Sequence, residues 1–165
     1  MSGDHTIALM GLLFLPVAVI PVLFVMQTLA TRSERLAGAW LRIAAAGPAT
    51  GIGVLLLLAS ADIHLTLVPA HLIEQPITGV LFGLDGVALT AAAIAAYLTP
   101  RWRLPALALL VANVLVYALY LGAGWESSDI IGVGTKLLEV AGIVAILDSY
   151  RVAPVAVAEA GGWAR

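Results

Sequence analysis

The chain contains no cysteine in its 165 residues. Disulfide bonds, thiolate metal sites and cysteine nucleophiles are therefore excluded. Charge is also scarce, because Asp, Glu, Lys and Arg together make up only 11% of the sequence. Eight basic residues stand against ten acidic ones, so the chain has no surplus of positive charge with which to hold nucleic-acid phosphates. We expect no nucleic-acid partner.

Apolar side chains, in contrast, are abundant. They make up 62% of the residues, and the mean hydropathy is +1.06. Soluble globular domains have an apolar fraction of about 45–50%. The composition therefore predicts an integral membrane protein that is surrounded by the lipid bilayer.

Long apolar runs separated by short polar breaks indicate where the chain crosses the membrane. A helix needs about 20 apolar residues to cross roughly 30 Å of hydrocarbon. The runs are continuously apolar and rich in helix-forming residues, whereas a membrane β-barrel would show short segments of alternating hydrophobicity. The sequence predicts an all-α bundle of five transmembrane helices. Their expected ranges are residues 6–30, 41–61, 69–98 or 77–98, 105–122 and 130–147.

Arginine positions indicate the orientation of these helices, because basic residues of short loops stay on the cytoplasmic side of the membrane. Arginines flank the first and third breaks and follow the fifth helix: Arg32, Arg35, Arg42, Arg101, Arg103 and Arg151. The second and fourth breaks are expected to hold carboxylates and no basic residue: Asp62, Glu74, Glu126 and Asp129. We expect a bacterial inner-membrane protein with its N-terminus outside. Residues 1–153 would form the transmembrane domain and residues 154–165 a flexible cytoplasmic tail.

Three ionisable residues fall inside the expected helices, namely Asp85, Lys136 and Glu139. Each costs at least about 2.5 kcal/mol to insert without a partner, so each calls for a partner or a role. Lys136 and Glu139 are three residues apart and share one helix face. Asp85 lies at similar depth on the third expected helix. The three can form a structural ion-pair network, or they can act as a relay for protons or cations.

Other polar residues are expected to face the same interior. If the third helix begins at Pro69, Thr78 lies on the same face as Asp85. The fourth expected helix carries Asn113, Tyr117 and Tyr120 at helical spacing. Because a polar face is disfavoured against lipid, these side chains should converge between the helices.

A second cluster combines two of the three histidines with two carboxylates at the expected outer rim: Asp62, His64, His71 and Glu74. Imidazole and carboxylate ligands suit divalent transition metals, and His71 and Glu74 have the spacing of helical metal ligands. Pro69 separates the two histidines and makes their relative placement uncertain. Ordinary hydrogen bonding at the membrane surface is the alternative interpretation.

Three classes of function are compatible with these patterns, and no pattern names a reaction. The first is a subunit that binds or transports an ion or small molecule, with an outward-facing polar vestibule that leads to Asp85, Lys136 and Glu139. The second is a membrane metalloprotein or metalloenzyme that uses the rim cluster. The third is a structural accessory subunit. Five helices form a thin bundle, so we also expect a homo-oligomer or membership of a larger membrane complex.

Overall fold

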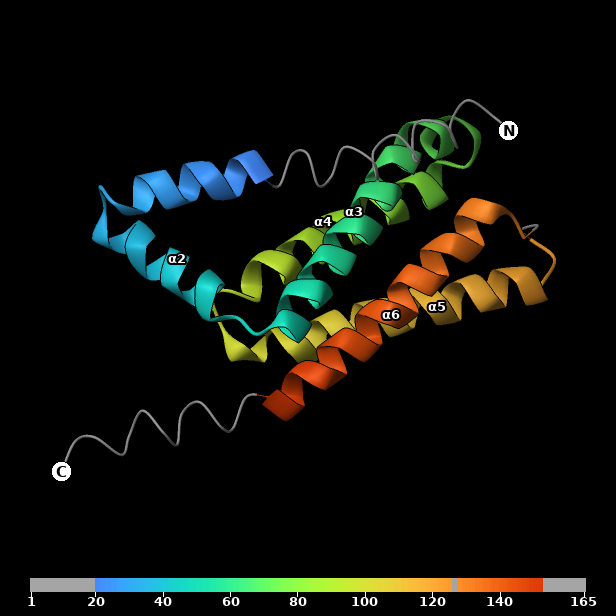
Figure 1. The fold of residues 1–165 in the computed structure, drawn as a ribbon. Helices are drawn as coiled ribbons and strands as arrows, with labels where there is room; N and C mark the ends of the chain where they lie inside the picture. Colours follow the sequence, from blue (N-terminus) through green and yellow to red (C-terminus); the bar gives the residue numbers. More distant parts are fainter. Residues whose placement is uncertain (1–19, 126–127, 153–165) are drawn as a thin grey trace.

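The computed structural model describes residues 20–125 and 128–152, and throughout this part of the chain the regular structure is helical (Figure 1). An apolar helical segment, Ile20–Ala30, comes first. The elements that follow it are α2 (Glu34–Ala45), α3 (Pro48–Glu74), α4 (Pro76–Ala95), the short 3-10 helix η1 (Pro100–Trp102), α5 (Arg103–Gly122) and α6 (Ile130–Val152).

Four of these helices, α3 to α6, are long and apolar enough to cross a membrane. Their spans of 20 to 27 residues correspond to lengths of about 30–40 Å at 1.5 Å per residue. They correspond to the second to fifth helices expected from the sequence. Of the first expected helix only the segment Ile20–Ala30 is described, and it is shorter than a membrane span. The rest of that helix and the 154–165 tail lie outside the described residues, so the first of the five expected spans and the orientation of the termini stay predictions.

The second expected helix was predicted to end too early, at residue 61, whereas the later of the two starts expected for the third helix, residue 77, lies one residue from the observed start. The second helix is α3, which begins at Pro48 and continues through Pro69 to Glu74. The third begins at Pro76, because Gln75 leaves the helical region with φ −142° and ψ 76°. A residue before proline avoids the helical conformation, and Pro76 is well suited to the first position of a new helix. Asp62 and His64 therefore lie within a helix, not in a break between helices.

The four long helices form a ring in which α3 contacts α4 and α6, and α5 contacts the same two helices (Figure 1). Large apolar side chains from all four fill the interior, and Leu57, Leu89, Leu110 and Ile146 have no exposed surface. Trp102 of η1 closes one end of this core and is 2% exposed. The close packing of these side chains against one another holds the four helices together.

Glycines allow α3 and α4 to approach closely. A Cβ atom added at Gly79 would lie 2.5 Å from the backbone nitrogen of Leu72, and one added at Gly86 would lie 2.6 Å from Cγ of Leu65. No larger residue fits either position without movement of α3. Small residues have this role at many helix contacts in membranes.

Arginine side chains join the helix ends at one end of the bundle. Arg42 donates a hydrogen bond from Nε to the carbonyl oxygen of Tyr97 at 2.9 Å, and Arg103 donates from Nε to Oγ of Ser149 at 2.9 Å. The turn at Gln75 and the chain between α5 and α6 lie at the opposite end. The four helices thus alternate in direction, and Arg42 and Arg103 lie at the same end of the bundle.

Candidate functional site

A cavity of about 520 Å³ lies between the four long helices. It reaches from residues near the Gln75 end, such as Thr78, Tyr120 and Asp129, to His64, Asp85 and Lys136 near the middle of their helices. We call it the central cavity. Its remaining wall is mainly apolar and aromatic, and includes Leu67, Leu81, Phe82, Leu109, Val116 and Tyr117.

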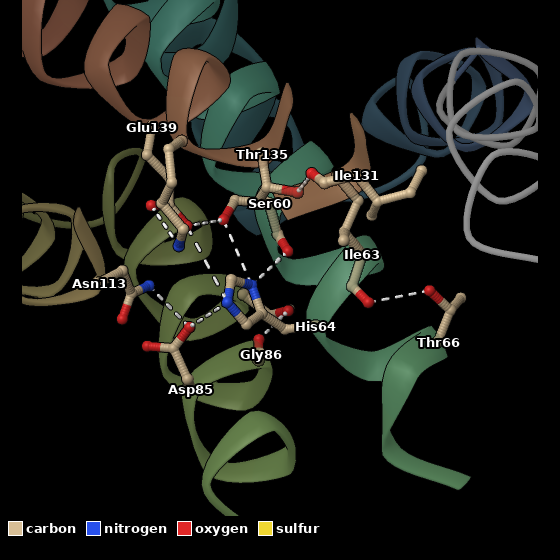
Figure 2. Close-up of polar contacts among 12 residues, drawn as sticks. Ser60, Ile63, His64, Thr66, Asp85, Gly86, Asn113, Ile131, Thr135 and Glu139 are labelled. Atoms are coloured by element: carbon tan, nitrogen blue, oxygen red, sulfur yellow. Dashed lines mark hydrogen bonds and ion pairs between the residues drawn. The ribbon is translucent and has the colours of Figure 1, made fainter. Parts of the chain in front are cut away.

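A cluster of polar side chains lies at the inner end of the central cavity: His64, Asp85 and Lys136 line the cavity, and the fully buried Ser60 and Glu139 are hydrogen-bonded to His64 and Lys136. Figure 2 shows the polar contacts of this region. We call this group the polar cluster; it consists of Ser60, His64, Asp85, Lys136 and Glu139. Lys136 donates from Nζ to both carboxylate oxygens of Glu139, at 2.7 and 2.9 Å. Glu139 is fully buried and also accepts a hydrogen bond from the Ser60 hydroxyl at 3.0 Å. A buried carboxylate needs this kind of compensation, because a membrane interior offers no water to replace it.

His64 lies at the centre of the polar cluster and is 5% exposed. Its Nδ1 is 2.8 Å from the carbonyl oxygen of Ser60, one turn earlier in α3. Since a carbonyl only accepts, Nδ1 carries a proton and donates it there. The other ring nitrogen, Nε2, lies 3.6 Å from Oδ2 of Asp85 and 3.9 Å from Oε1 of Glu139. One imidazole thus stands between carboxylates of two different helices.

Asp85 connects α4 to α5 and to the cavity. Its Oδ2 accepts a hydrogen bond from Nδ2 of Asn113 at 2.8 Å. The second oxygen, Oδ1, has no hydrogen-bond or ion-pair partner within residues 20–125 and 128–152. The side chain is 17% exposed and lines the central cavity. Asp85 therefore presents a carboxylate oxygen to any ligand that enters the central cavity.

Aromatic rings form the wall beside these charges. Phe82 of α4 contacts both histidines of α3, with ring centroids 5.3 Å from His64 and 4.8 Å from His71. The Tyr117 ring lies 5.6 Å from Nζ of Lys136. Aromatic faces attract positive charge in the absence of water. The wall is thus compatible with cations as well as with apolar groups.

The structure brings Asp85, Lys136 and Glu139 into one region, as the sequence analysis expected. Lys136 pairs with Glu139 on its own helix, and Asp85 reaches this pair through His64. Thr78, Asn113, Tyr117 and Tyr120 all line the central cavity. The functional roles expected for these residues stay predictions.

His64 was expected at the outer rim, and this placement was wrong. It lies well inside α3, because this helix does not end before Pro69. Ser60, which shares its helix face one turn away, was not expected in the site. The spacing of Ser60, His64 and His71 follows the helical period and could have revealed a continuous polar face.

The four residues of the expected metal cluster do not converge. His64 and His71 line the central cavity, but Glu74 is exposed at the end of α3, and Asp62 is not part of the lining. Within the described ranges there is no group of three or more His, Asp and Glu side chains that could hold a metal ion. No observation therefore favours the metalloprotein interpretation.

A second cavity, of about 430 Å³, lies at the arginine end of the bundle. Arg42, Arg103, Tyr97 and Ser149 line it together with the first residues of α3. Burial raises the pKa of the Tyr97 hydroxyl above its usual value of 10, so this group is neutral at physiological pH. The central cavity differs in being lined by carboxylates and by two imidazoles, those of His64 and His71.

Neither family models, curated proteins nor solved structures give a match to this chain. Its function is therefore argued from the site itself.

Proposed function

We propose that the chain binds a small organic cation in the central cavity, as a binding or transport subunit of a membrane. The observation that carries this proposal is the Oδ1 atom of Asp85, a carboxylate oxygen that has no partner among the described residues and lies at the inner end of a largely apolar cavity. A carboxylate removed from water is costly unless a positive charge compensates it. A bound cation would supply that charge.

The charges of the polar cluster support a cationic ligand. Lys136 is the only lysine of the sequence, and Glu139 binds its ammonium group through both oxygens. The positive charge of Lys136 is therefore already compensated. In the part of the chain that the structure describes, Asp85 has the amide of Asn113 as its hydrogen-bonded partner and the His64 ring at the longer distance of 3.6 Å. An anionic ligand would meet this carboxylate and be repelled.

The walls of the central cavity support a ligand with an apolar body. Ligand sites typically have volumes of about 300–1,000 Å³ and combine apolar walls with a few polar groups, and the central cavity of about 520 Å³ has both properties. Phe82 and Tyr117 would contact an aromatic or alkyl group. A small amine that carries one ring has the required charge and shape.

Calorimetry on the purified protein in detergent tests the proposal with two molecules of nearly equal shape. 2-Phenylethylammonium carries the charge, and 2-phenylethanol replaces it by a hydroxyl. We expect saturable binding of the amine and at least about tenfold weaker binding of the alcohol, a difference of about 1.4 kcal/mol. Equal binding of the two would contradict recognition of charge.

The variant Asp85→Asn removes the charge and keeps the shape of the side chain. It should weaken amine binding at least about tenfold and leave alcohol binding unchanged. The matched control is Asp148→Asn, because Asp148 is half exposed, pairs with Arg151 and lies outside the central cavity. Amine binding that is unaffected by Asp85→Asn would overturn the proposal.

The membrane that holds the bundle and the orientation of the bundle are also part of the proposal. We propose a bacterial inner-membrane protein with five spans, an external N-terminus and a central cavity that opens to the outside. The collection of arginines at the opposite end supports this orientation. Homo-oligomers or a larger membrane complex would cover the outward face of α5, where Leu104, Leu115 and Leu119 are between 58% and 72% exposed. This face also supports the second candidate, an accessory subunit.

A further inference from the structure

We propose that the second cavity, at the arginine end of the bundle, binds the phosphate group of an anionic phospholipid. This site is separate from the cation site in the central cavity, and the proposal does not depend on the proposed function. It rests on the charge of the second cavity, on the hydrogen-bond donors of its arginines and on its apolar rim.

Two arginines from different helices line the second cavity, Arg42 in the last turn of α2 and Arg103 at the start of α5. None of the described residues in its lining is an aspartate or a glutamate. Within residues 20–125 and 128–152 neither guanidinium has a carboxylate partner, and Asp148, near the same end of α6, pairs with Arg151. The second cavity therefore carries positive charge without a compensating negative charge.

Both guanidinium groups are held in place by the protein and keep donors for a ligand. Arg42 uses Nε for the carbonyl oxygen of Tyr97, and Arg103 uses Nε and Nη2 for the hydroxyl and carbonyl oxygens of Ser149. The other N–H groups, on Nη1 and Nη2 of Arg42 and on Nη1 of Arg103, have no hydrogen-bond acceptor in the part of the chain that the structure describes. Because a planar guanidinium matches the oxygens of a phosphate, these donors favour a phosphate group as the ligand.

The first turn of α3 adds backbone donors to those of the arginines. Ala49 and Thr50 follow Pro48 in this turn, and both line the second cavity. The N-cap residue Gly47 provides no side-chain oxygen for their N–H groups, and the turn contains no acidic residue. The positive end of the helix dipole therefore adds to the attraction that the two arginines exert on an anion.

The rim of the second cavity favours a phospholipid over a free phosphate ion. Leu98 lines the cavity and is 66% exposed, and Ile94, four residues earlier, is 58% exposed. The acyl chains of a lipid would cover these two side chains while its phosphate lies against the arginines. Basic pockets between transmembrane helices recognise anionic lipid headgroups by this combination of charge and apolar surface.

Native mass spectrometry of the delipidated protein in detergent tests the proposal with two lipids of equal acyl chains. Dioctanoyl-phosphatidylglycerol has a net negative charge, whereas in dioctanoyl-phosphatidylcholine a trimethylammonium group compensates for the phosphate. An arginine close to an anionic headgroup increases binding about fivefold. With two arginines we expect phosphatidylglycerol to bind at least about tenfold more tightly than phosphatidylcholine. Equal binding of the two lipids would overturn the proposal.

Inorganic phosphate distinguishes a lipid from a free anion. Because the acyl chains should contribute to binding, an equal concentration of inorganic phosphate should leave phosphatidylglycerol bound. Displacement of the lipid under these conditions would overturn the assignment to a phospholipid.

The variant Arg42→Gln removes one charge from the second cavity and keeps a hydrogen-bond donor. It should weaken binding of phosphatidylglycerol about fivefold and leave binding of phosphatidylcholine unchanged. Arg101→Gln is the matched control, because Arg101 is exposed at the same end of the bundle and is not part of the described lining of the second cavity. Equal weakening in the two variants would show a general attraction by surface charge and would overturn the site.

The variant Thr50→Asp tests the site from α3 and leaves both arginines in place. A carboxylate in the first turn of a helix is favourable, so this variant should fold. It places a negative charge in the second cavity and should weaken binding of phosphatidylglycerol about fivefold, since it offsets the charge of one arginine. Thr50→Asn has nearly the same shape without the charge and should bind the lipid as the unmodified chain does. Unchanged binding in Thr50→Asp would overturn the placement of the phosphate in this cavity.

Discussion

Nε2 of His64 lies 3.6 Å from Oδ2 of Asp85, and this approach joins the middle of α3 to the middle of α4 (Figure 2). The same nitrogen is 3.9 Å from Oε1 of Glu139 on α6. Asn113 extends the connection to α5 through its bond to Asp85. All four long helices therefore meet through one set of polar side chains, which makes these residues sensitive positions for stability as well as for binding.

Lys136→Met should destabilise the protein strongly, because it leaves the fully buried carboxylate of Glu139 without its positive partner. Breaking a buried ion pair in this way costs about 3–5 kcal/mol. The double variant Lys136→Met with Glu139→Gln should recover most of the loss. Unfolding experiments in detergent measure the stability of the single and the double variant.

The matched control for this pair is Lys136→Met combined with Asp148→Asn. Asp148 is distant from Lys136 in α6 and is half exposed, so it should give no recovery. Equal recovery in the two double variants, or additive losses for Lys136→Met and Glu139→Gln, would show that the ion pair does not matter for folding.

Gly79→Ala should destabilise the contact between α3 and α4. The added Cβ would meet the backbone of Leu72 at 2.5 Å, and backbone cannot move aside as a flexible side chain does. Overpacking of this kind costs about 1–3 kcal/mol.

Gly51→Ala is the control, because an added Cβ has nothing within 4 Å there. The control should be neutral or stabilising by up to about 1 kcal/mol, owing to the higher helix propensity of alanine. Similar losses at both positions would contradict close packing at Gly79.

Single cysteines introduced into this naturally cysteine-free chain test the orientation. Gln75→Cys lies in the exposed turn between α3 and α4, and Arg101→Cys is exposed in η1 at the other end of the bundle. A membrane-impermeant thiol reagent added to intact cells should label position 75 and not position 101. Labelling of position 101 alone would reverse the orientation.

The sequence was sufficient to predict the apolar helices, because membrane spans leave a strong signal in length and composition. It was insufficient at Pro69 and Pro76, since the two prolines have the same local effect on the residue before them. Contacts between helices decide whether the chain continues as a helix through each proline. Continuation of α3 through Pro69 brings His71 against Phe82, beside His64, although a proline inside a helix removes one backbone hydrogen bond.

The residues of the site were easier to predict than their partners. Asp85, Lys136 and Glu139 were conspicuous as charges within apolar runs. Their partners depend on how α3 is rotated against α4 and α6, and a single sequence contains no direct record of that rotation. His64 was assigned to the wrong environment because four polar residues between 62 and 74 were interpreted as a break. On a helix, residues 60, 64 and 71 share one face, and His64 and His71 of this face line the central cavity.

The single residue between α3 and α4 has a consequence for the synthesis of the protein. Because only Gln75 separates the two helices, they can enter the bilayer together as a helical hairpin, before α5 and α6 are made. The approach of His64 to Asp85 needs no later part of the chain, so the carboxylate of α4 can insert with a polar side chain already beside it. A hairpin with such local contacts forms rapidly, and it lowers the cost of placing a charge in lipid at the stage when the nascent chain is least protected.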